Sequence, residues 1–266
     1  MPIHAPMLPR LTTEELREID YAVMPHAFAA HKALGRLCDE RIYQAELAAR
    51  LDAAGLGPVR CEAAIHVSHR DFVKSYSLDL IIAERAIYEL KTVASLTTEH
   101  DAQLLNYLFL TNTTRGKLIN FRPGSVETRF VNTTLDHDER HRSHLNTSRL
   151  ATAIAGAVEI RDLMLALLDD WGLFLDAALY LEALTHFLGG EEQVVSQVPM
   201  RRENIELGNQ RFYLATPEVA FRISTIKHSF KQHERHLQQM LQLSPLQALH
   251  WVNLNNHEVT FTTITR

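Results

Sequence analysis

Three side chains in the first half of the chain have the types and spacing needed to hold a metal ion: Asp79, Glu89 and Lys91. Side chains alternate along a strand, so Glu89 and Lys91 would project from one face. If residues 77–91 form an antiparallel hairpin centred near Glu84, Asp79 lies directly opposite Glu89. We therefore expect two carboxylates and one ammonium group to converge.

Carboxylate oxygens suit Mg²⁺, which prefers hard oxygen donors and commonly binds through one or two carboxylates while keeping several waters. Such an ion can polarise a phosphodiester and lower the pKa of a bound water. Lys91 could orient or deprotonate that water and offset charge in the transition state. These residues thus predict metal-dependent hydrolysis of a phosphate ester. The alternative is that they lie on the wet face of an edge hairpin, where polar residues are expected.

Two helices are predicted ahead of the hairpin. Thr12 and Glu15 have the spacing of a capping box, and apolar residues recur at helical intervals over 16–34, with a break expected near Pro25. A second helix is predicted over 37–54, where two glycines follow. Short β-rich runs separated by polar turns then predict strands over 63–67, 76–82, 86–93 and 117–121, with a helix over 98–110.

The second half repeats this element order, which predicts a tandem duplication. We expect a first domain over 1–135, a linker over 136–149 and a second domain over 150–266. The linker is polar and rich in histidine and charge, and we interpret it as a solvated connector rather than a metal site. Several identities share one offset of 133 residues: His100 and His233, Leu104 and Leu237, Leu108 and Leu241, Asn120 and Asn253, Val126 and Val259. An offset of 137 relates Gly35 to Gly172 and Tyr43 to Tyr180.

Composition sets limits on the partners. The net charge of -5 argues against a wide basic surface, so contact with nucleic acid requires a local basic surface or help from a protein partner. No apolar run approaches the roughly 20 residues that span a bilayer, so no membrane contact is expected. With two cysteines, Cys38 and Cys61, and no signal-peptide pattern, the chain is expected in the cytoplasm.

The arrangement of Asp79 with Glu89-x-Lys91 and a following helix resembles the PD-(D/E)XK nuclease superfamily, and the first half resembles the bacterial GxxExxY proteins within it. The resemblance covers about residues 19–121. It rests on His31 and Gly35, Glu40 to Tyr43, Asp79, Tyr88 to Lys91, His100 to Leu108 and the strand Lys117 to Phe121. Two departures are Leu37, where the family's name-giving glycine is expected, and Ala63-Ala64 in place of its usual Val-Pro.

This resemblance implies an α/β fold with a restriction-endonuclease-like core, in which a mixed sheet is flanked by helices. It implies that Glu40 completes the acidic metal site with Asp79 and Glu89, and that Mg²⁺ or Mn²⁺ is the cofactor. Gln103 and Tyr107 match the QxxxY signature of RecB-type nucleases. The implied activity is cleavage of nucleic acid, in particular DNA.

For several of these positions an ordinary structural role stays open. Tyr43 and Tyr107 fit core or rim aromatics. His31 and His100 fit either ligands or phosphate contacts that support the site, or hydrogen-bonded structural histidines. Glu40 could instead be a surface glutamate. In that case Glu46 is a weaker candidate for the metal ligand on this helix.

The second copy lacks the metal-binding charges. At the 133-residue offset, Asp79, Glu89 and Lys91 correspond to Phe212, Arg222 and Ser224, and Gln103 corresponds to His236. A degenerate half that packs on the active half as a pseudo-dimer is therefore expected, with one active site per chain. Cations of the second half are candidates for backbone contacts with nucleic acid or are scattered surface charge: Arg201, Arg202, Arg211, Arg222 and Lys227.

Two other functions remain open from the sequence. The whole fold could be a catalytically idle adaptor that binds nucleic acid or protein, which suits the acidic net charge. It could also be a metal-dependent hydrolase of a nucleotide or another small phosphate.

Overall fold

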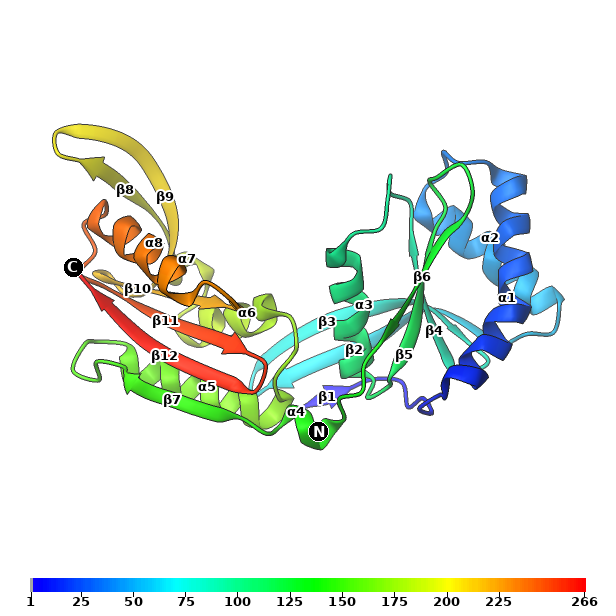
Figure 1. The fold of residues 1–266 in the computed structure, drawn as a ribbon, viewed down its shortest axis with the longest axis horizontal. Coiled ribbons are helices and arrows are strands. Elements are labelled where there is room, and N and C mark those ends of the chain that lie inside the picture. The colour runs from blue at the N-terminus through cyan, green and yellow to red at the C-terminus, as the bar shows by residue number, and fades with distance from the viewer. Residues whose placement is uncertain (1) are drawn as a thin grey trace. The chain divides into compact units, whose positions relative to one another are not determined.

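The computed structural model describes residues 2–266 and divides into two compact units. Unit 1 holds the chain up to Ser68 together with Val73–His137, and unit 2 holds His69–Phe72 together with Asp138–Arg266. Each unit is built around a six-stranded sheet with helices packed on it (Figure 1). The predicted mixed α/β class is therefore confirmed for each half.

Unit 1 contains two long helices before its main strands and one helix between them. Its elements are β1 (Ile3–His4), α1 (Thr13–Leu34), α2 (Glu40–Ala53), β2 (Val59–His69), β3 (Phe72–Ile82), β4 (Ala86–Lys91), α3 (Thr98–Leu110), β5 (Arg115–Asn120) and β6 (Glu127–Asn132). The strands lie in the order β1-β2-β3-β4-β5-β6. β4 and β5 are parallel, whereas β3–β4 and β5–β6 are antiparallel.

The first helix begins as predicted but is not broken. Thr12 and Glu15 form a complete capping box at its start, which satisfies backbone N–H groups that a helix leaves unpaired. Pro25 lies inside a continuous α1. A proline removes one helical hydrogen bond, but Val23 and Ala27 on either side of it are buried and keep the helix packed on the core. The expected break is therefore wrong.

The sheet of unit 1 separates two differently packed faces. Apolar residues of α1, α2 and the strands form one core, in which Tyr43 stacks on Phe121 with ring centroids 4.5 Å apart. α3 covers the other face and comes close to β5 at Gly116, where an added Cβ would lie 3.1 and 3.2 Å from the Leu104 and Leu108 side chains. A residue of β4 therefore points either into the α1–α2 core or towards α3.

Unit 2 has the same succession of main elements. They are α4 (His137–Arg140), β7 (His144–Arg149), α5 (Ala157–Trp171), α6 (Ala177–Phe187), α7 (Glu191–Val194), β8 (Val195–Arg202), β9 (Ile205–Thr216), β10 (Val219–Ser224), α8 (Phe230–Gln242), β11 (Ala248–Asn255) and β12 (Glu258–Thr265). The strands lie in the order β7-β12-β11-β10-β9-β8. On one face, α8 packs on Trp251, while the neighbouring His250 bonds to Ala155 O ahead of α5, so helices cover both faces.

The strand registers of the two units agree at a uniform separation of 133 residues. Glu89 pairs with Leu118 in the parallel β4–β5 ladder, as Arg222 pairs with Trp251 in β10–β11. The antiparallel pairs Leu80–Tyr88 and Tyr213–Phe221 are related in the same way, as are Asn120–Glu127 and Asn253–Thr260.

Residues 136–149, predicted to be a solvated connector, carry regular structure. Asp138 onwards is part of unit 2, and β7 adds to its sheet by parallel pairing with β12. The Arg140 guanidinium is 3% exposed and donates to Leu173 O and Trp171 O. Polar composition concealed this edge strand and the buried cation that caps carbonyl groups, but every residue of β7 is exposed to solvent, and the predicted domain bounds stay a prediction.

No helix among the residues that the structure describes has the length and apolar character to cross a membrane.

Both cysteine thiols are free.

A buried ion pair joins α1 to β5, and its loss should weaken unit 1. Lys117 Nζ lies 2.7 and 2.6 Å from the two Asp20 carboxylate oxygens, and the Lys117 side chain is 4% exposed. We expect Asp20→Ala to destabilise unit 1 by about 3–5 kcal/mol, because it leaves the buried ammonium without a carboxylate. Hydrogen exchange of α1 and β5 peptides in urea measures this, since both tryptophans lie in unit 2.

The matched control is Glu18→Ala on the exposed side of the same helix, which should change stability by less than about 0.5 kcal/mol. Adding Lys117→Met to Asp20→Ala should recover much of the loss. A loss from Asp20→Ala as small as that from Glu18→Ala would contradict a stabilising pair.

Candidate active site

Glu89 and Lys91 form a buried ion pair on β4. Every residue of this strand is buried, and Glu89 is 1% and Lys91 8% exposed. Lys91 Nζ donates to Glu89 Oε1 over 2.8 Å. Tyr88 and Leu90 pack in the α1–α2 core, so Glu89 and Lys91 project to the opposite face, where α3 lies. The predicted sharing of one face by Glu89 and Lys91 is confirmed.

Asp79 lies where β3 leaves β4. The antiparallel ladder pairs Leu80 with Tyr88 and closes through a turn at Ala83 and Glu84, so the predicted hairpin and its centre are confirmed. Asp79 lies one residue beyond the last pair of this ladder, Leu80–Tyr88, and so falls opposite Glu89 in that register. Its Oδ2 accepts a hydrogen bond from Leu90 N over 2.7 Å. The Asp79 side chain thus satisfies the Leu90 N–H of β4, next in the chain to Glu89.

The charges of these three residues interact. Burial and, to a lesser extent, the Asp79 carboxylate raise the pKa of Glu89 to about 8, although Lys91 acts to lower it. Burial also raises the pKa of Asp79, against the Leu90 N–H and Lys91, which lower it. Burial lowers the pKa of Lys91, but Glu89, Glu40 and Asp79 together raise it above its usual value. A site of this kind favours a cation shared between the acids.

Glu40 belongs to the same group through the start of α2. Burial is the main cause that raises its pKa, and Asp79 adds to the rise, while Lys91 and a hydrogen bond with the Thr92 backbone lower it. Thr92 directly follows Lys91 at the end of β4. The helix glutamate therefore lies beside the end of the strand that carries the ion pair, and it is half-buried rather than a free surface residue.

Gln103 and Tyr107 lie on α3 next to this group. Gln103 Nε2 donates to the Tyr107 hydroxyl over 3.2 Å. Burial raises the pKa of Tyr107, the Gln103 bond lowers it, and Glu89 and Asp79 raise it. Tyr76 of β3 meets the Tyr107 ring edge to face at 6.2 Å. Tyr107 is thus a buried rim aromatic, while Gln103 is exposed to solvent.

Three other predicted positions make structural contacts. His31 Nε2 lies 3.0 Å from Pro123 O. His100 Nδ1 accepts from Thr97 N over 2.9 Å and completes the capping of α3. The buried Tyr43 hydroxyl donates to Gly35 O over 2.6 Å. Each contact agrees with the structural alternative, and none of them joins the residue to Asp79, Glu89 or Lys91.

Sequence analysis missed Glu62 and Gln44. Gln44 Nε2 donates both to Glu62 Oε1 and to Asp79 O, over 2.9 and 2.8 Å. Glu62 also raises the pKa of Asp79. Two signals were available: Gln44 lies one helical turn after Glu40, and Glu62 and Asp79 are equidistant from the hairpin turn at 70–71.

Asn120 was noted only for its repeat, but it holds the loop that leaves the site. Its Oδ1 accepts from Val93 N over 3.0 Å, and its Nδ2 donates to Val93 O over 2.8 Å. In the parallel ladder it is the partner of Lys91. Asn120 is fully buried, so this amide fixes where β4 ends.

The donors fit a divalent cation that is bound by two carboxylates and water. Within residues 2–266, no three His, Cys, Asp or Glu side chains are grouped so as to hold a metal ion, so Asp79, Glu89 and Glu40 are not assembled as a three-ligand set. The reason is that Asp79 bonds to a backbone N–H and Glu89 to Lys91. Glu89 Oε2, however, is buried and has no hydrogen-bond partner among the described residues. A buried carboxylate oxygen in this state can accept a proton or a cation.

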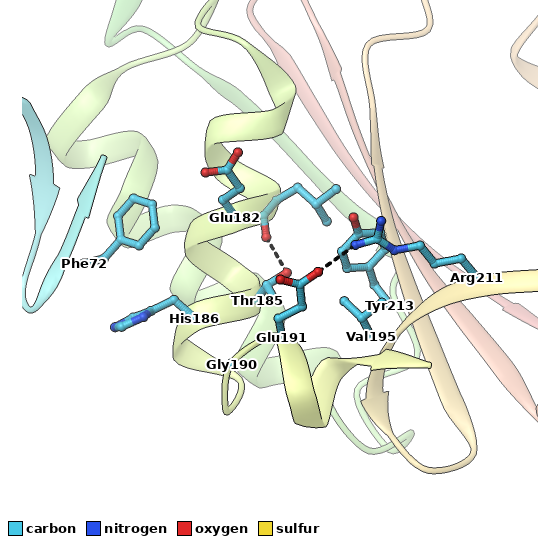
Figure 2. A pocket seen from close by; sticks show the side chains of 10 residues that line it. Phe72, Glu182, Thr185, His186, Gly190, Glu191, Val195, Arg211 and Tyr213 are labelled. Carbon is cyan, nitrogen blue, oxygen red and sulfur yellow. Dashed lines mark hydrogen bonds and ion pairs between the residues drawn. The ribbon is translucent and has the colours of Figure 1, made fainter. Parts of the chain in front are cut away.

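A pocket of about 450 Å³ in unit 2 is a weaker candidate (Figure 2). None of the predicted catalytic or metal-binding residues lines it, although Arg211, a candidate for backbone contact, does. The residues that line it are Phe72, Leu181, Glu182, Thr185, His186, Gly190, Glu191, Val195, Arg211 and Tyr213. Arg211 is held by Glu191 over 3.1 Å, and Thr185 Oγ1 donates to Leu181 O, as Figure 2 shows. The polar groups at this pocket are therefore largely satisfied by one another.

One protein-family model matches part of the chain. Residues 17–131 match a family model described as the PD-(D/E)XK nuclease superfamily. This region contains Glu40, Asp79, Glu89, Lys91 and Gln103. No curated protein matches the chain.

One solved structure matches, described as the crystal structure of SSO0001, with 22% identity and a TM-score of 0.30. The alignment covers 47% of this chain and 61% of that chain. At this TM-score the likeness supports no conclusion about fold or function.

The buried Glu89 carboxyl should make stability depend on pH in the metal-free protein. Its pKa is about 8 in the fold against 4.5 ordinarily, so above pH 4.5 the unfolded chain loses this proton first. The stabilising contribution is therefore full below pH 4.5 and is lost as pH rises through about 8. We expect Glu89→Gln to gain stability relative to wild type over this range, by at most about 1.4 kcal/mol per pH unit.

Urea unfolding in EDTA at several pH values measures the difference between the two proteins. The control, Glu18→Gln on the exposed side of α1, should follow the wild-type profile. Parallel profiles for wild type and Glu89→Gln would show that Glu89 is ionised throughout.

Proposed function

We propose that unit 1 is a metal-dependent phosphodiester hydrolase, a nuclease that acts on DNA, with one active site per chain. The observation that carries the proposal is the buried Glu89–Lys91 pair beside Asp79 at the point where β3 leaves β4. The match of residues 17–131 to the PD-(D/E)XK nuclease superfamily supports it. Burying two ionisable groups in an apolar interior is costly, so a role in chemistry accounts for their position.

In this proposal Asp79 and Glu89 hold Mg²⁺ or Mn²⁺, with Glu40 as a further acid at the start of α2. A bound ion of this kind polarises the phosphodiester and lowers the pKa of the attacking water. Lys91, already within 2.8 Å of Glu89, stabilises negative charge that develops on the phosphate. Gln103 is exposed above the site and positions the substrate, with Tyr107 behind it.

We further propose that unit 2 is a degenerate copy of unit 1. The common 133-residue separation of the strand registers supports this. So do two repeated contacts. The Tyr180 hydroxyl donates to Gly172 O as Tyr43 does to Gly35 O. The Asn253 amide bonds to both backbone groups of Ile226, as Asn120 does to those of Val93.

The positions of the active site have different chemistry in unit 2. Phe212 replaces Asp79 and is buried, and Arg222 replaces Glu89 and is exposed. Ser224 replaces Lys91 and bonds to Asn253 and Trp251. This copy has no carboxylate at the three positions, which supports a single active site per chain. The predicted packing of both halves as a pseudo-dimer stays a prediction.

The alternative is a catalytically idle adaptor that binds nucleic acid or protein. The lack of a three-ligand group among residues 2–266 and the net charge of -5 favour it. Metal binding separates the two proposals, because an adaptor does not require it.

Cleavage should depend on the three residues of the site. We expect Asp79→Asn, Glu89→Gln and Lys91→Met each to lower the rate at least about 100-fold. The first two remove carboxylates that hold the metal ion, and the third removes the cation that stabilises negative charge on the phosphate. The assay uses linear, nicked and branched DNA with Mg²⁺ or Mn²⁺, with RNA of matched sequence alongside.

Glu46→Gln is the control for this assay. Glu46 lies on α2 like Glu40, but it pairs with Arg50 over 2.6 Å at the surface, so the rate should not change. Equal rates for the wild type and all three site variants would rule out this active site.

Binding of Mn²⁺ should need the same acids and should release a proton near neutral pH. The proton comes from Glu89, whose raised pKa leaves it protonated before the ion binds. Calorimetry in two buffers of different ionisation enthalpy measures both the affinity and the proton release. Binding should disappear in Asp79→Asn and persist in Glu46→Gln; an unchanged affinity in Asp79→Asn would favour the adaptor.

A further inference from the structure

A short segment of unit 2 concentrates positive charge on an acidic protein. Residues 222–236 contain four Lys or Arg residues and one Glu, for a net charge of +3. All four cations are exposed: Arg222, Lys227, Lys231 and Arg235. The single acid, Glu234, is taken by an ion pair with Arg149 of β7.

The fold brings these cations onto adjoining elements. Lys231 and Arg235 are four residues apart on α8, so their side chains lie one turn apart on its exposed side. Burial lowers the pKa of His233, and the positive charges of Arg222 on β10 and His236 on α8 lower it further. Both residues are therefore close to His233. Lys227 directly follows Ile226, which Asn253 fixes by two hydrogen bonds. We call Arg222, Lys227, Lys231, Arg235 and His236 the basic face.

The fold itself does not require this charge. The corresponding segment of unit 1, residues 89–103, contains three acids and one Lys, for a net charge of -2. Helix α3 has Glu99 and Asp101 in its first turn, whereas α8 has no acid there and carries Lys231. Acids are favoured and cations disfavoured at a helix start. The basic face therefore lowers the intrinsic stability of α8 unless an anion compensates for it.

The aromatic residues beneath the basic face are not available to bases. Trp251 is 1% exposed, and the rings of Phe230 and His233 cover it at 4.6 and 5.2 Å. Phe230 is the one Phe, Tyr or Trp in residues 222–236 and is half-buried, so no fully exposed ring of these types offers a platform for stacking unpaired bases there. Exposed cations without such a platform suit the sugar-phosphate backbone, which they contact without reading sequence.

We propose that the basic face of unit 2 binds the phosphate backbone of nucleic acid independently of sequence and of metal. The binding itself needs no catalysis; only the choice of nucleic acid as the polyanion rests on the proposed function. In this arrangement unit 1 cuts the substrate and unit 2 holds it. The corresponding segments differ in charge accordingly, with acids in unit 1 and cations in unit 2.

The test measures DNA binding in EDTA, so that neither cleavage nor metal contributes. Fluorescence anisotropy of a labelled 25-base-pair duplex and of a 25-nucleotide single strand is followed from about 50 to 300 mM NaCl. We expect Lys231→Gln with Arg235→Gln to weaken duplex binding about tenfold. A plot of log affinity against log salt concentration has a negative slope, and its magnitude should decrease by about 2, since each phosphate contact contributes about 0.9.

The matched control is Arg17→Gln with Lys32→Gln, which removes the same charge from exposed positions of α1 in unit 1. It should leave affinity and slope nearly unchanged. Equal losses in both double variants would show a general charge effect and overturn the proposal. Unchanged DNA binding in Lys231→Gln with Arg235→Gln would also overturn it, and would point to an acidic protein as the partner of this face.

The result is separable from the fate of the proposed nuclease. A protein that binds DNA through the basic face but does not cut with Mg²⁺ or Mn²⁺ refutes only the active site. If the protein cuts DNA but substitutions in the basic face do not change its DNA affinity, only this inference is refuted.

Discussion

Burial of the Glu89 carboxyl beside the Lys91 ammonium is the constraint around which unit 1 is arranged. Two ionisable groups on a strand whose residues are all buried lose their hydration. The surroundings compensate in part: Lys91 bonds to Glu89, and Asp79 bonds to Leu90 N in place of a neighbouring backbone group. Two apolar residues at positions 89 and 91 would be buried without needing these hydrogen bonds. The separation of β3 from β4 at Asp79 is therefore linked to the burial of Glu89 and Lys91.

Local rules predicted the elements that local interactions define. The Thr12 capping box fixed the start of α1, and the predicted helix over 98–110 coincides with α3. The symmetric turn near Glu84 set the β3–β4 register. These features depend on neighbours in the chain, so their residues carry enough information.

Features that depend on distant contacts were missed. Continuity of α1 across Pro25 depends on burial of its flanks, and β7 is a strand only because β12 lies beside it. Glu62 reaches the site through Gln44, a contact between a helix and a different strand. Periodicity does not report such pairings.

The two units keep the same framework while their charges differ. The contacts that recur are those that satisfy backbone groups: Tyr43 and Tyr180 on glycine carbonyls, and Asn120 and Asn253 on loop residues. Buried backbone groups need partners in any version of the fold. The charges at the positions of Asp79, Glu89 and Lys91 do not recur in unit 2, where Phe212, Arg222 and Ser224 stand. Phe212 packs in the core of unit 2, and Ser224 bonds to Asn253 and Trp251, so these positions have structural roles there.

The amide of Asn120 has a mechanical consequence for the connection between β4 and α3. It grips both backbone groups of Val93, and Glu127 of β6 bonds in turn to Asn120 and to Leu96 N. Hydrogen bonds therefore hold this connection at two points, Val93 and Leu96. In unit 2 the Asn253 grip persists, but Thr260 occupies the position of Glu127. The corresponding connection there, which carries Lys227, has one anchor fewer of this kind.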